Sequence, residues 1–102
     1  MNYIGAIVNI LEPPQQIIVK DNISLTRFRA QLCQVHETQV VHIVIWGNLA
    51  DDIIKYYDIN DYILIEGYVS VPSFPDLESG LESLNNIQIT VLKIYPVLLS
   101  PT

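Results

Sequence analysis

The sequence predicts an all-β domain with one short helix, and three observations support this fold class. β-branched and aromatic residues dominate the apolar runs, and such residues favour strands. Several runs alternate between apolar and polar residues, which is the period of a half-buried strand. One stretch near the middle of the chain instead has apolar residues at helical spacing. Because 102 residues suffice to bury a core, we expect a single domain over residues 1–102.

The composition excludes several classes of protein. Half of the residues are hydrophobic and only 16% are charged, so a disordered chain is not expected. The longest apolar runs are too short to cross a bilayer. The N-terminus lacks the positively charged region and the cleavage site of a secretory signal. The single cysteine, Cys33, fits a reducing compartment, where we expect it to be a buried thiol. These features predict a cytoplasmic protein that is neither secreted nor bound to a membrane.

The middle of the chain reads as strand, helix and strand. His42 to Trp46 is β-branched and aromatic, as in a strand. From Leu49 to Tyr57, apolar residues recur at helical spacing, and we expect the helix to stop near Asn60, which suits the left-handed conformation found after helix ends. Alternation then resumes from Tyr62 to Val71. Gly67 interrupts it, which predicts a bend or the close approach of another backbone.

Further strands are predicted on both sides of this central stretch. Residues 2–11 form a nearly continuous apolar run that two prolines end, and residues 17–19 form a short edge-like piece. Alternation over residues 24–35 predicts the second main strand, and residues 87–95 form the last one, after a long loop at residues 72–86. Five main strands with one helix between the third and the fourth is the arrangement of the OB-fold, a five-stranded Greek-key barrel. A barrel or small sandwich of another topology is the alternative.

Two of the predicted strands carry candidate binding residues. In the second strand, alternation places Arg27 and Arg29 on the face opposite the apolar one. In the third strand, it places His42 and Trp46 together on one face. Basic groups for phosphates and aromatic rings for bases are what non-specific binding of single strands requires. The alternatives are surface ion pairs for the arginines, packing in the barrel for the tryptophan and a structural role for the histidine.

The sequence contains no pattern that predicts catalysis or a metal site. Glu78 and Glu82 are four residues apart but have no histidine or cysteine partner, so a solvated segment explains them. Cys33 lacks a nearby histidine that would make it a nucleophile. A phosphate-binding glycine loop is also missing. We therefore expect no enzyme activity, no small-molecule substrate, no cofactor and no metal.

Residues 43–69, IVIWGNLADDIIKYYDINDYILIEGYV, resemble the bacterial and organellar single-stranded-DNA-binding proteins (SSB). The resemblance rests on the pairs Trp46–Gly47, Leu49–Ala50, Tyr56–Tyr57, Asn60–Asp61 and Glu66–Gly67. It extends over almost the whole domain and is strongest to the small SSB-like open reading frame of red-algal plastids and cyanobacteria. It implies an OB-fold that binds single-stranded DNA without sequence preference, supports DNA replication in the plastid and forms a homo-oligomer, either a dimer or a tetramer.

The resemblance also implies roles for aromatic residues. The family's aromatic at the position of Trp46 stacks on a base, and Phe74 lies where the family has a stacking aromatic in its long loop. The alternative for Phe74 is that it anchors the loop on the barrel. Tyr68, on the outward face of its strand, is a third candidate for stacking, with an oligomer contact as its alternative. Two arginine–phosphate contacts, by Arg27 and Arg29, predict a salt slope of about −1.4 in log K against log salt.

The net charge supports a competing hypothesis. Eleven acids against five bases give a charge of −6, so any nucleic-acid face must be local. The connection at residues 36–39 is also shorter than the basic loop that the family has there. These features favour an acidic OB-fold module for protein interaction or oligomerisation that has lost DNA binding. The strand at residues 4–10, apolar on both faces, suits dimerisation.

Overall fold

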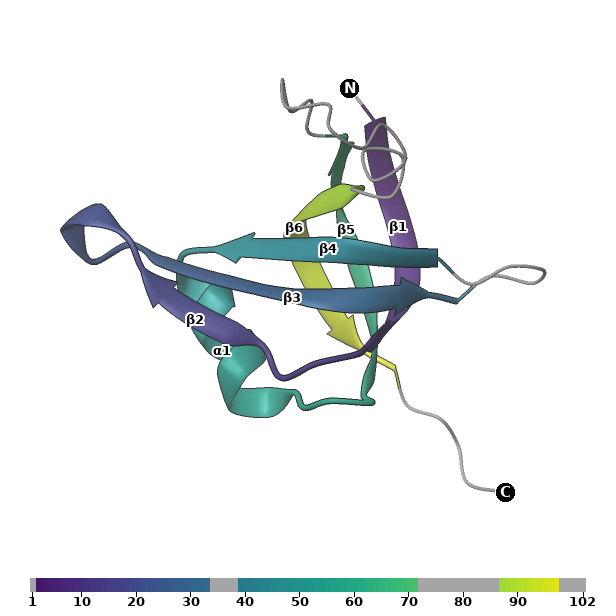
Figure 1. The fold of residues 1–102 in the computed structure, drawn as a ribbon, viewed down its shortest axis with the longest axis horizontal. Coiled ribbons are helices and arrows are strands. Elements are labelled where there is room, and N and C mark those ends of the chain that lie inside the picture. Colours follow the sequence, from purple (N-terminus) through teal and green to yellow (C-terminus); the bar gives the residue numbers. More distant parts are fainter. Residues whose placement is uncertain (1, 34–38, 72–86, 98–102) are drawn as a thin grey trace, which may run out of the picture.

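The computed structural model describes residues 2–33, 39–71 and 87–97. This part of the chain contains six strands and one α-helix, arranged as Figure 1 shows. The strands are β1 (Asn2–Ile10), β2 (Gln15–Ile18), β3 (Ser24–Leu32), β4 (Gln39–Trp46), β5 (Tyr62–Ser70) and β6 (Gln88–Pro96), the helix is α1 (Asn48–Tyr56), and a turn of 3-10 helix spans Lys20–Asn22. The all-β class and the place of the helix are therefore confirmed. The predicted loop at residues 72–86, and residues 36–38 of the predicted connection, lie outside the described residues.

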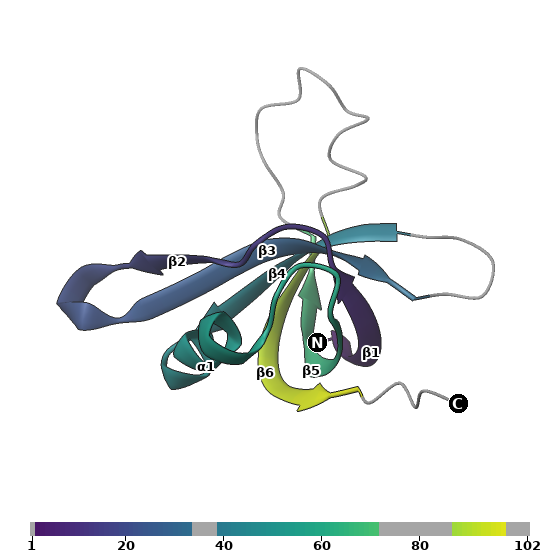
Figure 2. The same cartoon turned by 90° about the horizontal axis from the view of Figure 1, so that it is seen from below.

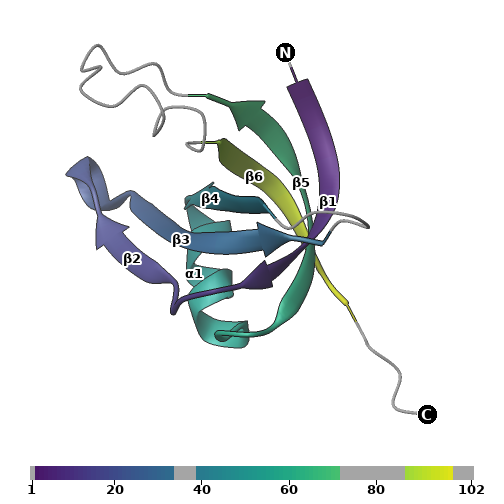
Figure 3. The same ribbon diagram turned by 45° about the vertical axis from the view of Figure 1, so that its right-hand side comes forward.

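Five of the strands close into a barrel. The strand order is β1-β5-β6-β4-β3-β2, and β1 also pairs with β3, from Val8 opposite Leu32 to Ile10 opposite Ala30. The β4–β6 pair is parallel, and the other pairs are antiparallel. Figure 3 shows β3 and β4 running across β1, β5 and β6. This order confirms the predicted OB-fold. The sixth strand, β2, pairs only with the outer edge of β3 and corresponds to the predicted edge-like piece.

The core fills the barrel and the space beneath α1. Alternate positions of the strands supply six isoleucines that are completely buried, namely Ile10, Ile43, Ile45, Ile63, Ile65 and Ile89. Figure 2 shows α1 beside β3 and β4, and the helix buries Ala50 and Ile53 against the core. The buried hydroxyl of Thr26 in β3 donates a hydrogen bond of 2.9 Å to the Ala50 carbonyl, which fixes the helix to the sheet. The outer face of β3 and β4 is left uncovered by α1.

Gly67 lies at a β-bulge where β5 and β6 come unusually close. The register between these strands shifts between Glu66 and Gly67. A Cβ atom on Gly67 would lie 2.1 Å from the backbone oxygen of Thr90, well inside van der Waals contact. Only glycine fits this position without movement of the strands, and the predicted close approach of a backbone is confirmed.

Two local predictions were wrong. The helix ends at Tyr56 and not near Asn60. Asn60 does have the expected positive φ of 75°, but it belongs to a separate turn and its N–H donates to the Ile10 carbonyl at 2.7 Å, which draws this segment towards β1. Cys33 is exposed and not buried. It directly follows the buried Leu32, so the alternation that buries Leu32 turns Cys33 outward.

Candidate nucleic-acid interface

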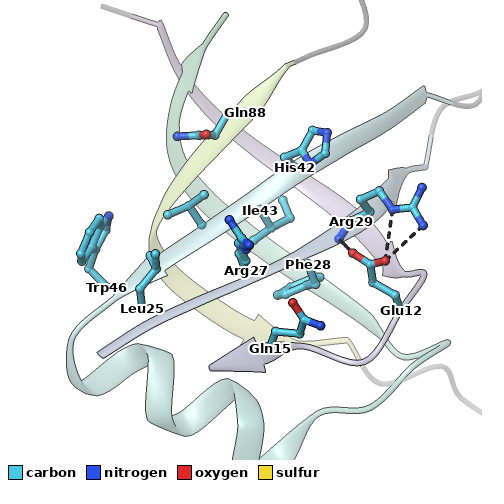
Figure 4. A pocket seen from close by; sticks show the side chains of 11 residues that line it. Glu12, Gln15, Leu25, Arg27, Phe28, Arg29, His42, Ile43, Trp46 and Gln88 are labelled. Atoms are coloured by element: carbon cyan, nitrogen blue, oxygen red, sulfur yellow. Dashed lines mark hydrogen bonds and ion pairs between the residues drawn. The ribbon is translucent and has the colours of Figure 1, made fainter. Parts of the chain in front are cut away.

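A shallow cavity of about 640 Å³ lies on the outer face of β3 and β4. Figure 4 shows its lining side chains, which come from β3, β4, the start of β2, the segment before it and the edge of β6. The cavity is lined by Glu12, Gln15, Leu25, Arg27, Phe28, Arg29, His42, Ile43, Val44, Trp46 and Gln88. Four of the six predicted site residues are therefore brought together: Arg27, Arg29, His42 and Trp46.

The pairing of β3 with β4 explains why these four residues meet. The two strands are antiparallel, and Arg29 lies opposite His42, Arg27 opposite Val44 and Leu25 opposite Trp46. Side chains of directly opposed residues point to the same side of a sheet. Because Phe28 and its alternate neighbours are buried, both arginines are turned outward on this face. The predicted alternation in both strands is confirmed, and it supplies the arrangement of the site.

Trp46 occupies the last position of β4, at the end of the cavity away from Arg29 (Figure 4). The residue is 48% exposed, so it does not belong to the core of the barrel. Gly47 follows with a φ of 73° and its N–H donates to the Ser24 carbonyl at 2.9 Å, which fixes the turn from β4 into α1. The indole is thus an accessible aromatic surface on a backbone that is held in place.

The opposite end of the cavity contains an ion pair of Arg29, the alternative that the sequence left open for the arginines, with a partner that the sequence did not predict. Glu12 accepts a hydrogen bond from the backbone N–H of Arg29 at 2.8 Å and another from its Nε at 3.1 Å. The Nη2 of Arg29 lies 3.1 Å from the same carboxylate. The hydrogen bond from the Arg29 backbone N–H is the largest effect and lowers the pKa of Glu12 below its usual value; burial opposes it, and the Arg29 guanidinium lowers the pKa further. The carboxylate is therefore ionised at neutral pH, and the pair persists.

Tyr68 lies outside the cavity but on the same outer surface of the sheet. Across the strands, Val44 is opposite Thr90, and Thr90 is opposite Tyr68. Tyr68 in turn packs against Tyr3 of β1, with the ring centroids 5.4 Å apart and the planes at 75°. This edge-to-face contact is a favourable geometry for two aromatic rings. Tyr68 as a DNA contact stays a prediction, and Phe74 lies outside the described residues.

Sequence reasoning missed lining residues that come from outside the two main strands. Glu12, Gln15 and Gln88 reach the cavity because β1, β2 and β6 pass beside β3 and β4. The one signal that points to Glu12 is its position two residues after β1, because β1 and the second main strand pair in an OB-fold. Within the described ranges, no group of three or more histidine, cysteine, aspartate or glutamate side chains is arranged to hold a metal ion. Nor does any helix there have the length and apolar character needed to cross a membrane.

A curated relative, and not a family model, identifies the family of this chain. No family model matches the chain. A curated protein of Trieres chinensis, named "Putative single-stranded DNA-binding protein ycf41", is 38% identical over 105 residues, which cover 97% of this chain and 91% of the relative.

Solved structures of low sequence identity share the fold. The SSB domain of a Synechococcus protein superposes with a TM-score of 0.73 at 20% identity, covering 93% of this chain and 94% of that one. The second single-stranded DNA-binding protein (SSBb) of Mycobacterium smegmatis gives a TM-score of 0.76 at 15% identity, covering 99% of this chain and 96% of that one. With the 38% identity to the curated relative over nearly its full length, these findings show that the chain belongs to the family of single-stranded-DNA-binding proteins.

Proposed function

We propose that this protein binds single-stranded DNA without sequence preference through the outer face of β3 and β4. The observation that carries the proposal is that Trp46, Arg27 and Arg29 gather around one cavity on the sheet face that α1 leaves uncovered. An indole ring is a platform on which any base stacks, and guanidinium groups neutralise phosphates. Membership of the family supports the same ligand. The protein would act by binding alone, without a catalytic step, a cofactor or a metal.

The proposed interface is basic only locally. Arg27, Arg29 and His42 point to the same side of the sheet, whereas the chain as a whole has a net charge of −6. Among the described residues that line the cavity, Glu12 is the single acid. Because few cations are available and distant acids repel phosphates, we expect modest affinity that is highest at low salt, where the favourable local contacts are least screened.

The resemblance supports two finer parts of the proposal, a role in DNA replication and a location in the plastid. We include both in the proposal. We also propose that the bound DNA strand continues across the sheet from Val44 over Thr90 to Tyr68. The register of β4, β6 and β5 puts these three residues in one row on the outer surface. Such a row would let neighbouring bases contact a second aromatic side chain.

We also propose that the protein is a homo-oligomer, a dimer or a tetramer. Two surfaces support this. The first half of β1 pairs with β5 on one side, while its pairing with β3 begins only at Val8, which leaves a strand edge accessible among the described residues. The outer face of β1, β5 and β6 exposes, beyond the proposed DNA path, a group of large apolar side chains that a second copy would cover, namely Tyr3, Ile7, Tyr62, Leu92 and Tyr95.

Tyr95→Lys should weaken the oligomer, because Tyr95 lies opposite Leu64 on this face and the change would place a charge among its apolar side chains. Sedimentation of wild type and variant over a range of concentrations measures the effect. Tyr56→Lys is the matched control, since Tyr56 is an exposed tyrosine on α1, away from this face. A wild-type protein that sediments as a monomer at high concentration would contradict the proposal.

An acidic protein-interaction module is the second candidate function. The ion pair that neutralises Arg29, together with the net charge of −6, favours it. On this hypothesis the sheet face retains the family's shape but no longer attracts phosphates, and the protein pairs with itself or with a basic partner.

Fluorescence anisotropy with labelled oligo-dT at low salt separates the two functions. The proposed function predicts saturable binding of oligo-dT and weaker binding of a duplex of equal length, because bases in a duplex are not free to stack on the sheet. Arg27→Gln should lower the affinity for oligo-dT. Equal binding of both nucleic acids, or binding of neither, would contradict single-strand recognition and favour the interaction module.

A further inference from the structure

The ion pair between Glu12 and Arg29 lies inside the proposed nucleic-acid site and has no part in the function proposed for it. We infer that Glu12 withholds Arg29 from phosphate, so that the site uses Arg27 as its phosphate contact and Glu12 limits the affinity. This inference rests on the proposed function of the same face. It makes Glu12 a positioning residue that acts on DNA through Arg29.

The geometry shows that the carboxylate takes the place a phosphate would occupy. Glu12 Oε1 lies 3.1 Å from both the Nε and the Nη2 of Arg29. This edge of a guanidinium is one that binds carboxylates and phosphates in a planar, charge-assisted arrangement. A phosphate therefore has to displace Glu12 before it gains the same contacts. Figure 4 shows the carboxylate and the guanidinium facing each other at the edge of the cavity.

The carboxylate is held by more than the arginine side chain. Glu12 Oε2 accepts the backbone N–H of Arg29 at 2.8 Å, and the backbone N–H of Leu11 donates to the Arg29 carbonyl at 3.1 Å. Pro13 follows Glu12 and restricts the backbone at this point. The carboxylate thus stays beside β3 even if the guanidinium turns away, and its charge would then face an approaching phosphate.

Arg27 differs from Arg29 in this respect. It lines the same cavity and points to the same side of β3, but it forms no ion pair among the described residues. Both partners of the Glu12–Arg29 pair are accessible, with 37% and 56% of their side-chain surfaces exposed. Removal of the Glu12 charge would therefore leave Arg29 free at a position that DNA can reach.

A salt titration measures the number of phosphate contacts. Each contact with single-stranded DNA contributes about −0.7 to the slope of log K against log salt. The inference predicts a slope near −0.7 for the wild type, contributed by Arg27. Glu12→Gln retains an oxygen that accepts the Arg29 N–H but removes the competing charge, so its slope should steepen to about −1.4. At about 50 mM salt its affinity for oligo-dT should be about five- to tenfold higher than that of the wild type.

Two further variants separate this effect from a general change of charge. Adding Arg29→Gln to Glu12→Gln should abolish the gain and return the slope to that of the wild type, because the extra contact is made by Arg29. Asp52→Asn removes one negative charge from an exposed position of α1 outside the cavity and should change neither slope nor affinity appreciably. Denaturation curves confirm that each variant is folded.

The outcomes distinguish this inference from the proposed function. Equal slopes for the wild type and Glu12→Gln would overturn the inference and leave single-strand binding intact, as would a gain that survives Arg29→Gln. Absence of saturable binding in the wild type and in every variant would overturn the proposed function and the inference with it. If Glu12→Gln does not fold, the wild-type slope decides: a value near −0.7 supports the inference, and one near −1.4 contradicts it.

Discussion

Trp46→Ala should weaken the binding of single-stranded DNA by about 10- to 100-fold, because base stacking on an aromatic side chain contributes about 1–3 kcal/mol per base. The effect on folding should be small, since nearly half of the Trp46 surface is exposed. Anisotropy titrations of labelled oligo-dT measure the change in affinity directly. Trp46→Phe should recover most of the loss, because the phenyl ring retains a flat face for the base.

The matched control for this prediction is Tyr56→Ala. Tyr56 is an exposed aromatic residue on α1 that does not line the cavity of the interface, so its removal should leave the affinity for oligo-dT unchanged. If Trp46→Ala binds as tightly as the wild type, or if Tyr56→Ala loses as much affinity, the stacking role of Trp46 is wrong.

Gly67→Ala should destabilise the fold by about 3 kcal/mol or more, because the new methyl group would meet backbone and not a flexible side chain. The Cβ would lie 2.1 Å from the Thr90 oxygen and 2.9 Å from the Val91 Cα. Relief of this clash requires β5 and β6 to separate at the bulge, which would break hydrogen bonds in the middle of the barrel. Urea denaturation followed by circular dichroism measures the loss as a lower transition midpoint.

Gly5→Ala provides the comparison within the same sheet. A Cβ on Gly5 would have its nearest neighbour at 3.8 Å, in ordinary contact with the Glu66 side chain. This substitution should be neutral or stabilising by about 0.5 kcal/mol, because alanine reduces the freedom of the unfolded chain. A Gly67→Ala protein with the same midpoint as the wild type would show that the bulge is not the constraint that the structure indicates.

The sequence alone predicted the parts of the fold and site that depend on local patterns. Strict alternation in β3 and β4 requires Arg27 and Arg29, and likewise His42 and Trp46, to turn away from the core. Gly67 was noticed from a local pattern, because a glycine inside a strand indicates a bend or a close backbone contact, but the backbone that approaches it belongs to the distant β6. These features were predicted because side-chain direction in a strand follows from its period of two.

Features that depend on contacts between distant segments were not predicted. Glu12 and Arg29 are 17 positions apart and meet only because the chain leaves β1 beside β3. The early end of α1 has a similar origin, since the hydrogen bond from Asn60 to Ile10 connects the segment after the helix to β1. Apolar spacing gives the face of a helix but not the point where a tertiary contact ends it. The alternation implies that Cys33 is exposed. The prediction of a buried thiol instead followed the usual burial of cysteine, and it was wrong.

The fold connects these observations to the proposed function. Closure of the barrel by β1 and β3, with α1 covering the core on the inner side, leaves the outer face of β3 and β4 uncovered by any described helix. That face holds one exposed indole, one unpaired guanidinium in the described part of the chain and one paired with Glu12. We therefore expect stacking to contribute more than charge to the affinity, in keeping with the acidic composition.

Titration of the Trp46 fluorescence of the wild-type protein with unlabelled oligo-dT at low salt tests the central claim most directly. Trp46 is the only tryptophan in the chain, so any change in the signal reports on the proposed interface. We predict quenching that saturates with oligo-dT and is reversed by added salt, because base stacking on the indole requires the strand to be held on this face. Absence of quenching at low salt, where phosphate contacts are strongest, would contradict the account.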